Sequence, residues 1–145
     1  MKKVIELLNQ YVADLSVMNV KFHNLHWNVT GKNFKAVHEH LEALYDALFE
    51  TYDEAAERIK MLGDYPMASV KEYLQITKVK ELESKDVETA KAFEIVKQDF
   101  MYLKDLAIKI RAAADEVDDF GTVMILEDHV AAYDKELYFI NQTLK

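Results

Sequence analysis

The chain has 145 residues, of which 50% are hydrophobic and 30% charged, with three Gly, one Pro and no Cys. This length suits a single domain over residues 1–145, and the scarcity of Gly and Pro favours long helices over the many turns of a β-sandwich or barrel. The absence of Cys excludes disulfides, thiolate metal sites and thiol nucleophiles, so a metal ion would need His, Asp and Glu ligands. The net charge of −8 argues against a nucleic-acid-binding module and favours attraction of cations.

The start of the sequence and its hydropathy bear on location. Residues 1–6 lack the apolar region and the small-residue cleavage site of a secretory signal, and no stretch is apolar enough to span a bilayer. We therefore expect a soluble, cytoplasmic protein with no membrane partner. Lys2 and Lys3 fall far short of a polybasic arm, which argues against DNA binding through a terminus.

Two long helices are predicted in the first half of the chain. Apolar residues spaced three and four apart predict a helix over 4–25, which should end near Gly31, where a left-handed backbone is possible. Asn33 can cap the next helix, whose apolar stripe covers 34–59 and should end at 63–66. Because the loop between them is short, the two helices should be antiparallel neighbours.

A long connection follows, over residues 65–85, and within it Ser69 and Glu72 have the spacing of a capping box, which predicts a helix of one or two turns. Two further stripes predict helices over 93–110 and 120–144. Two hairpins joined by one long crossover are typical of a ferritin-like four-helix bundle. The predicted fold is therefore all-α, with a short helix in the crossover between the second and third long helices.

Polar residues on the second helix form two pairs spaced four apart, His38 with Glu42 and Asp53 with Glu57. Eleven residues separate Glu42 from Asp53, which keeps both pairs within about 20° of one face but roughly 16 Å apart along the axis. One chain therefore cannot bring all four to one ion. If two copies of the helix cross antiparallel about a two-fold axis, each pair meets the opposite pair of the partner, and His26 could add another nitrogen.

Mixed imidazole and carboxylate ligands suit Fe, Mn or Zn better than Ca or Mg. The competing interpretation of these pairs is a solvated helix face, because polar pairs four apart are common on long helices. No Glu stands three residues before any of the five His, so the Glu-x-x-His motif of di-iron sites within one bundle is absent. A complete ligand set inside one subunit is therefore disfavoured.

Five sequence segments together match a known pattern: His23-Asn24-Leu25-His26-Trp27, Gly31, Asn33-Phe34, His38-Glu39 and Asp53-Glu54-Ala55-Ala56-Glu57-Arg58. They resemble the Dps family of mini-ferritins, closely over residues 22–63 and mainly in helix pattern in the C-terminal half. The resemblance implies a hollow homo-oligomeric shell, usually a dodecamer, that acts as a ferroxidase. Such a shell oxidises Fe(II), preferably with hydrogen peroxide, stores ferric mineral inside and protects against oxidative stress.

The resemblance also implies a ligand set for iron between two subunits. Carried over by position, the family's ligands fall on His26 and His38 of one subunit and on Asp53 and Glu57 of its partner, with Zn or Mn as competitors for Fe. Four residues after the second His the family usually has Asp, whereas this chain has Glu42. Because the carboxylate is kept, we expect Glu42 to bind the metal ion. Its extra methylene could change the affinity for the ion and whether one or two ions occupy the site.

Other residues near these positions have weaker assignments. Trp27 resembles the family's tryptophan beside the site, which is thought to absorb stray oxidising equivalents; the alternative is an aromatic packed in an interface. We expect His23 to pack or to support a ligand. His40 is turned about 160° from His38 and should lie at the surface or the lumen. His129 matches no ligand position, which favours an ordinary structural role.

The region around the start of the last helix is acidic. Family members often line three-fold iron-entry pores with acids here, although this chain has Met124 where an acid is common. A negative channel would concentrate Fe(II), and the alternative is that these acids complement the dipole at a helix start. The acidic residues are Asp115, Asp118, Asp119, Glu127 and Asp128.

Three functions remain open. The leading hypothesis is an iron storage and detoxification protein that oxidises Fe(II) with hydrogen peroxide or dioxygen between subunits and deposits ferric mineral. The second is a DNA-coating structural protein, since some family members coat DNA, but the net charge of −8 and the lack of a basic tail argue against it. The third is a metal-binding cage in which Glu42 has removed the redox turnover.

Overall fold

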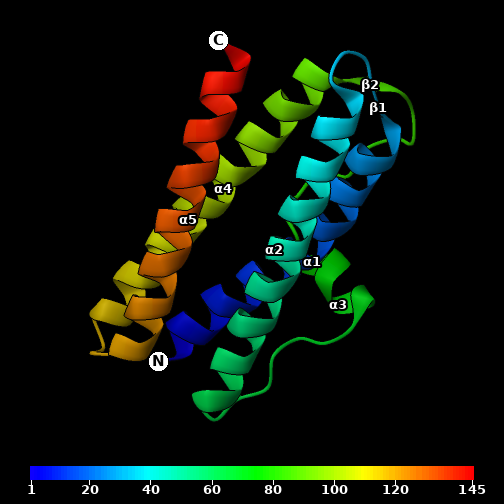
Figure 1. Cartoon of the computed structure of the whole chain (residues 1–145). Coiled ribbons are helices and arrows are strands. Elements are labelled where there is room, and N and C mark those ends of the chain that lie inside the picture. The colour runs from blue at the N-terminus through cyan, green and yellow to red at the C-terminus, as the bar shows by residue number, and fades with distance from the viewer.

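The computed structural model describes residues 1–145 and consists of four long helices, one short helix and two very short strands (Figure 1). The long helices form the all-α bundle that the sequence predicts, and the short helix lies in the crossover. In chain order the elements are α1 (Lys2–Asn28), β1 (Val29–Thr30), α2 (Phe34–Met61), α3 (Val70–Ile76), β2 (Val87–Glu88), α4 (Thr89–Asp115) and α5 (Phe120–Leu144).

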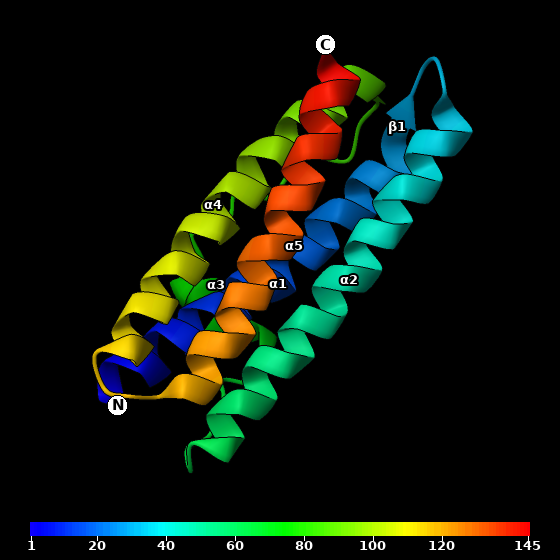
Figure 2. The ribbon, with the colours of Figure 1, turned by 60° about the vertical axis from the view of Figure 1, so that its left-hand side comes forward.

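The bundle is built from two antiparallel hairpins, α1–α2 and α4–α5, with α1 packed against α4 (Figures 1 and 2). The crossover runs along the bundle from the end of α2 to the start of α4, so the two termini lie at opposite ends. The apolar stripes of the four long helices meet in one cluster of 32 buried residues, to which the crossover adds Tyr73. No helix is long and apolar enough to cross a membrane.

Two turn predictions need correction. α1 ends at Asn28 and the chain continues as β1, which pairs in parallel with β2, so Gly31 (φ +114°) lies beyond a strand and not at the helix end. Asn33 directly precedes α2, but its backbone is left-handed (φ 62°) and its side chain makes no capping hydrogen bond. The capping box is confirmed, because the Ser69 hydroxyl accepts from the Glu72 backbone N–H at 3.3 Å.

Asp14 holds the crossover against the bundle. Its carboxylate is fully buried in α1 and accepts hydrogen bonds from the Thr77 hydroxyl at 2.8 Å and from the Lys78 backbone N–H at 2.9 Å. On the other side it accepts from the Tyr102 hydroxyl of α4 at 2.5 Å and from Gln10 at 3.0 Å. A single buried carboxylate therefore joins α1, α4 and the segment that follows α3.

Polar side chains join α2 to α5 at three levels. Near one end, His40 lies 3.4 Å from Glu136, and further along, the Glu54 carboxylate contacts His129 Nε2 at 2.5 Å. At the other end, the Arg58 guanidinium donates to the Asp119 carboxylate at 2.5 Å. Since α2 carries the predicted ligand pairs, these contacts fix how that helix is presented on the bundle.

Candidate metal centre

His26 and His38 come together where α1 ends and α2 begins. Their rings stack with centroids 3.6 Å apart and planes 16° from parallel. Nδ1 of each ring lies 2.7 Å from the other residue's backbone carbonyl oxygen. Because a carbonyl can only accept, each Nδ1 carries a hydrogen, and in the neutral imidazole each Nε2 then has the free lone pair. This tautomer, with Nδ1 bonded to a carbonyl and Nε2 free, is one that metal-bound His adopts.

Tyr45 supports this pair and was missed by the sequence reasoning. Its ring stacks on His23 with centroids 3.6 Å apart and meets His26 edge-on at 5.3 Å. Its hydroxyl donates to the exposed Glu42 carboxylate at 3.3 Å. Partial desolvation and the Glu42 charge raise the pKa of Tyr45. The spacing of Tyr45 from Glu42, three residues along one helix, is the only signal that could have indicated it.

His23 and Trp27 lie at the edge of this cluster. His23 has the supporting position expected of it, because its Nδ1 donates to the Asn19 carbonyl at 2.7 Å and its ring stacks on Tyr45. Trp27 is 69% exposed and contacts His23 with ring centroids 5.6 Å apart. Within one chain the indole is therefore mostly exposed, with His23 as its aromatic neighbour.

Asp53 and Glu57 are exposed on the later turns of α2. A hydrogen bond with Asp53, together with its charge, raises the pKa of Glu57. Both residues line a pocket of 410 Å³ with Glu50, Glu54, Met61 and Ile125. A cation would relieve the repulsion between these carboxylates, so the residue types fit a divalent ion.

The structure brings His26 and His38 together and places Glu42 one turn further along α2, but Asp53 and Glu57 stay separate from them. No group of three or more His, Asp or Glu side chains within the chain is arranged to hold a metal ion. The face of α2 between the two pairs carries Phe49, whose side chain is 62% exposed.

The acidic residues near α5 have different environments. Asp119 is buried and forms the N-cap of α5, where it accepts from Thr122 and from Arg58, each at 2.5 Å. Burial alone would raise the pKa of Asp119, but these hydrogen bonds outweigh it and hold the pKa below its ordinary value. Asp119 therefore has the helix-start role, whereas Asp118 and Asp128 are exposed.

Gly121 leaves room for the Arg58 guanidinium beside this cap. An added Cβ there would lie 2.6 Å from the Arg58 guanidinium, which is too close for any side chain unless Arg58 moves. Asp115 and Glu127 both pair with Arg111, at 3.1 and 2.9 Å, and Met124 is exposed.

The two remaining histidines lie between helices. His40 is half-buried against Glu136 and not fully at the surface, and His129 is buried between α1 and α2 side chains.

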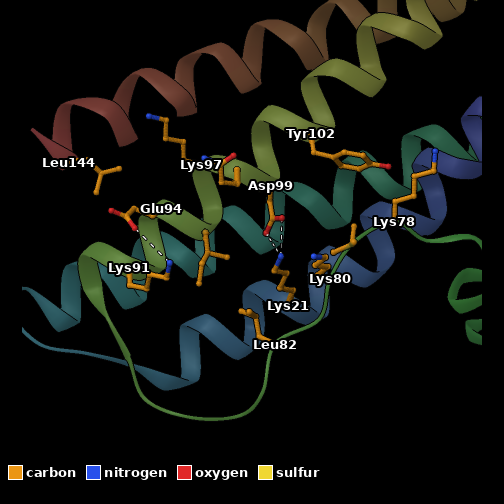
Figure 3. A pocket seen from close by; sticks show the side chains of 13 residues that line it. Lys21, Lys78, Lys80, Leu82, Lys91, Glu94, Lys97, Asp99, Tyr102 and Leu144 are labelled. Carbon is orange, nitrogen blue, oxygen red and sulfur yellow. Dashed lines mark hydrogen bonds and ion pairs between the residues drawn. The ribbon is translucent and has the colours of Figure 1, made fainter.

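A cavity of 730 Å³ lies between the crossover, α1 and α4 (Figure 3). Lys21 and Asp99 form a buried ion pair in it at 2.8 Å. Burial raises the pKa of Asp99 against the opposing effect of Lys21. The cavity as a whole is lined mainly by positive side chains, which do not suit a bound cation. The five lysines that line it are Lys21, Lys78, Lys80, Lys91 and Lys97.

Comparison with known proteins agrees with this fold. The family model described as ferritin-like domain matches residues 5–145. Antigen TpF1 of Treponema pallidum is 37% identical over 98% of this chain and 80% of its own length, and its crystal structure matches with a TM-score of 0.97 over 99% of this chain and 92% of its own. The DNA protection during starvation protein of Helicobacter pylori is 30% identical over 98% of this chain and 99% of its own length.

A Dps protein from Vibrio cholerae, described as a member of a broad superfamily of ferritin-like diiron-carboxylate proteins, is 29% identical. Its structure matches with a TM-score of 0.94 over 99% of this chain and 90% of its own. The bundle with its single long crossover therefore defines a ferritin-like protein. Within that class, the chain belongs to the Dps family.

Proposed function

We propose that this protein oxidises Fe(II) at sites shared between two subunits and stores the ferric product in a shell. The observation that carries the proposal is the His26–His38 pair, whose two Nε2 lone pairs are set for metal binding by reciprocal hydrogen bonds. Each site would combine this pair and Glu42 of one subunit with Asp53 and Glu57 of the other. Zn or Mn would compete for the same ligands.

Exposed apolar side chains around the candidate ligands support the shared site. Phe49 is 62% exposed on α2, and Val20 and Trp27 are 60% and 69% exposed on α1. Val20 and Trp27 are seven residues apart and so share a helix face with each other. Large apolar groups gathered on one exposed surface favour burial against a partner. A second copy of α2 that crosses antiparallel about a two-fold axis near Ala47 and Leu48 would bury these groups and bring the acidic pair to the histidines.

The residues of the chain would bind and orient the iron, whereas Fe(II) gives the electrons and hydrogen peroxide accepts them. Reduction of hydrogen peroxide to water takes two electrons, and each Fe(II) ion gives one. Carboxylates from Asp53 and Glu57 neutralise the charge that iron gains on oxidation. The acidic pocket that continues from them to Glu50 and Glu54 offers the ferric product a path away from the site.

The proposal is tested by size-exclusion chromatography with light scattering after anaerobic Fe(II) loading and a pulse of hydrogen peroxide. A large shell that co-elutes with ferric absorbance is the expected result. A large shell that binds Fe(II) without oxidising it would indicate the metal-binding cage instead. A monomer would contradict the shared site, because one chain alone does not complete it.

One observation favours a second function, binding of DNA. The 730 Å³ cavity carries five lysines against Glu94 and Asp99, although the chain as a whole has a net charge of −8. Lys78 and Lys80 come from the crossover and Lys97 from α4, so the positive groups span two elements (Figure 3). Such a surface could contact phosphates without a basic tail.

A gel-shift titration over a range of salt tests this function. If the cavity binds DNA, changing Lys80 and Lys97 to Ala should reduce the slope of log affinity against log salt by about 1 per lysine. Changing Lys71 and Lys109, which do not line the cavity, serves as the control. The absence of any retention at physiological salt would exclude DNA binding by this surface.

A further inference from the structure

A continuous chain of hydrogen bonds runs from the middle of the bundle to the acidic pocket. The Tyr11 hydroxyl, fully buried in α1, lies 3.2 Å from His129 Nδ1, and His129 Nε2 lies 2.5 Å from the Glu54 carboxylate. The hydroxyl of Tyr133, also buried, forms a short hydrogen bond with that of Tyr11. None of these four residues belongs to the candidate ligand set.

The direction of each hydrogen bond in this series follows from the Glu54 carboxylate at one end. A Glu54 carboxylate can only accept, so His129 Nε2 donates to it, and in the neutral imidazole Nδ1 is then the acceptor. Tyr11 therefore donates its hydroxyl hydrogen to Nδ1, and Tyr133 donates to the Tyr11 oxygen. Tyr11 is thus a phenol with a base in direct contact, in a place that water does not reach.

The outer end of this chain meets the candidate site. Glu54 follows Asp53 in sequence and lines the same 410 Å³ pocket as Asp53 and Glu57. Only one imidazole ring separates the Glu54 carboxylate from the Tyr11 oxygen. An apolar core needs no such base beside a tyrosine, because two buried tyrosines could satisfy each other with a single hydrogen bond.

We infer that Tyr11, with His129 as its proton acceptor, is a one-electron donor that quenches radicals formed when iron reacts with hydrogen peroxide. The inference rests on the proposed iron oxidation. When one Fe(II) ion reduces peroxide by one electron, the O–O bond breaks and leaves hydroxide and a hydroxyl-radical equivalent. That radical takes an electron from Tyr11 and a proton from solvent to give water, and the Tyr11 hydroxyl proton moves to His129 Nδ1.

The product is a tyrosyl radical beside a protonated His129, and a later Fe(II) ion returns the electron while His129 returns the proton. Burial, and then the charge of Tyr133, raise the pKa of Tyr11 well above its ordinary value, so the resting phenol keeps its hydrogen. Oxidation makes the phenol a far stronger acid, and the contact with Nδ1 gives its proton a destination without solvent access. Burial also keeps the radical from coupling with another molecule.

Freeze-quench electron paramagnetic resonance after anaerobic Fe(II) loading and a peroxide pulse tests the inference, with ferric absorbance followed in parallel. Shells containing ring-deuterated tyrosine distinguish a tyrosyl signal from one on Trp27. Wild-type shells should show a tyrosyl radical, and Tyr11→Phe should remove it and increase hydroxyl radicals caught by a spin trap. Tyr11→Phe should also lower the ferric iron formed per peroxide, because the Fe(II) ion that re-reduces Tyr11 is then not oxidised by this route.

Two variants separate this role from core packing. Tyr133→Phe removes a hydroxyl from the same buried cluster but leaves the Tyr11–His129 contact, so the radical should persist. His129→Leu keeps Tyr11 but removes its base, and the radical yield should fall roughly tenfold or more. A tyrosyl signal unchanged in Tyr11→Phe, or iron oxidation by wild type without such a signal, would overturn the inference alone. A wild-type shell that oxidises no iron would overturn it together with the proposed function.

Discussion

His26 and His38 are arranged for metal binding before any metal arrives. Each ring is fixed by the backbone carbonyl of the other residue, at 2.7 Å in both directions, so neither must choose a tautomer on binding. Tyr45 adds a third ring, which meets His26 edge-on. Such preorganisation lowers the entropy cost of ordering ligands around an ion.

Replacing His38 with Ala should slow Fe(II) oxidation by roughly 10–100-fold and leave the shell assembled, because one nitrogen and the support for His26 are lost together. Stopped-flow absorbance of ferric iron measures the rate. His40→Ala is the matched control, since His40 lies two residues away and pairs with Glu136. Equal rates for both variants would exclude His38 from the site.

The identities of the candidate ligands could be predicted from spacing and resemblance. The side-chain and backbone contacts that hold these ligands in place could not. The stacking of His26 on His38 depends on the turn between α1 and α2, which places residues twelve apart in register. In the sequence, Tyr45 is one more apolar position of the stripe over 34–59, and nothing there indicates its contact with His26. The buried environment of Asp119 was likewise hidden, because Arg58 lies far from it in sequence.

At the scale of elements, the long helices follow from their apolar periodicity, and the departures lie at the connections. β1 and β2 have two residues each and leave no periodic pattern, so their pairing could not be predicted. The path of the crossover depends on Asp14, which looks like any polar residue in a helix sequence. Three of its four hydrogen bonds exist only once α4 and residues 77–78 surround it, and the fourth comes from Gln10 in the same helix.

Asp14→Ala should therefore lower the free energy of unfolding by about 3 kcal/mol or more, because it leaves several buried donors without a partner. Urea unfolding at one fixed protein concentration measures the loss, since assembly adds to apparent stability. Asp46→Ala, at an exposed position of α2, should change stability by less than about 0.5 kcal/mol. Comparable losses in the two variants would contradict the anchoring role of Asp14.

Asp119→Asn should lower the free energy of unfolding at neutral pH by about 1–3 kcal/mol, because it weakens the cap of α5 and the pair with Arg58. The folded pKa of Asp119 is depressed, so its contribution is fully present above the unfolded pKa of about 3.9 and is lost as pH falls through the lower folded value. Thermal unfolding from pH 7 downwards should show the wild type and the variant converging at acid pH. A difference that persists unchanged at acid pH would exclude the ionised cap as its cause.

At the scale of the whole molecule, each subunit is proposed to supply the histidine half of one site and the acidic half of another. The histidine end of α2 and its acidic end lie on one helix, and Phe49 is exposed between them. Under the proposed function, two-fold symmetry would turn this arrangement into two equivalent sites for each pair of subunits. From the sequence, this geometry could be predicted only on the assumption that a second copy packs antiparallel on α2. The apolar periodicity of one subunit does not show which surface contacts another subunit.

Co-assembly of two inactive variants tests the shared site most directly. Shells made only of His38→Ala subunits, or only of Glu57→Ala subunits, should oxidise Fe(II) slowly. In shells co-assembled from equal amounts of both, half of the two-fold contacts join unlike subunits and each of these holds one intact site, so about a quarter of the wild-type rate should return. Preformed shells of the two variants mixed together should stay slow. No recovery in co-assembled shells would contradict a site built from two subunits.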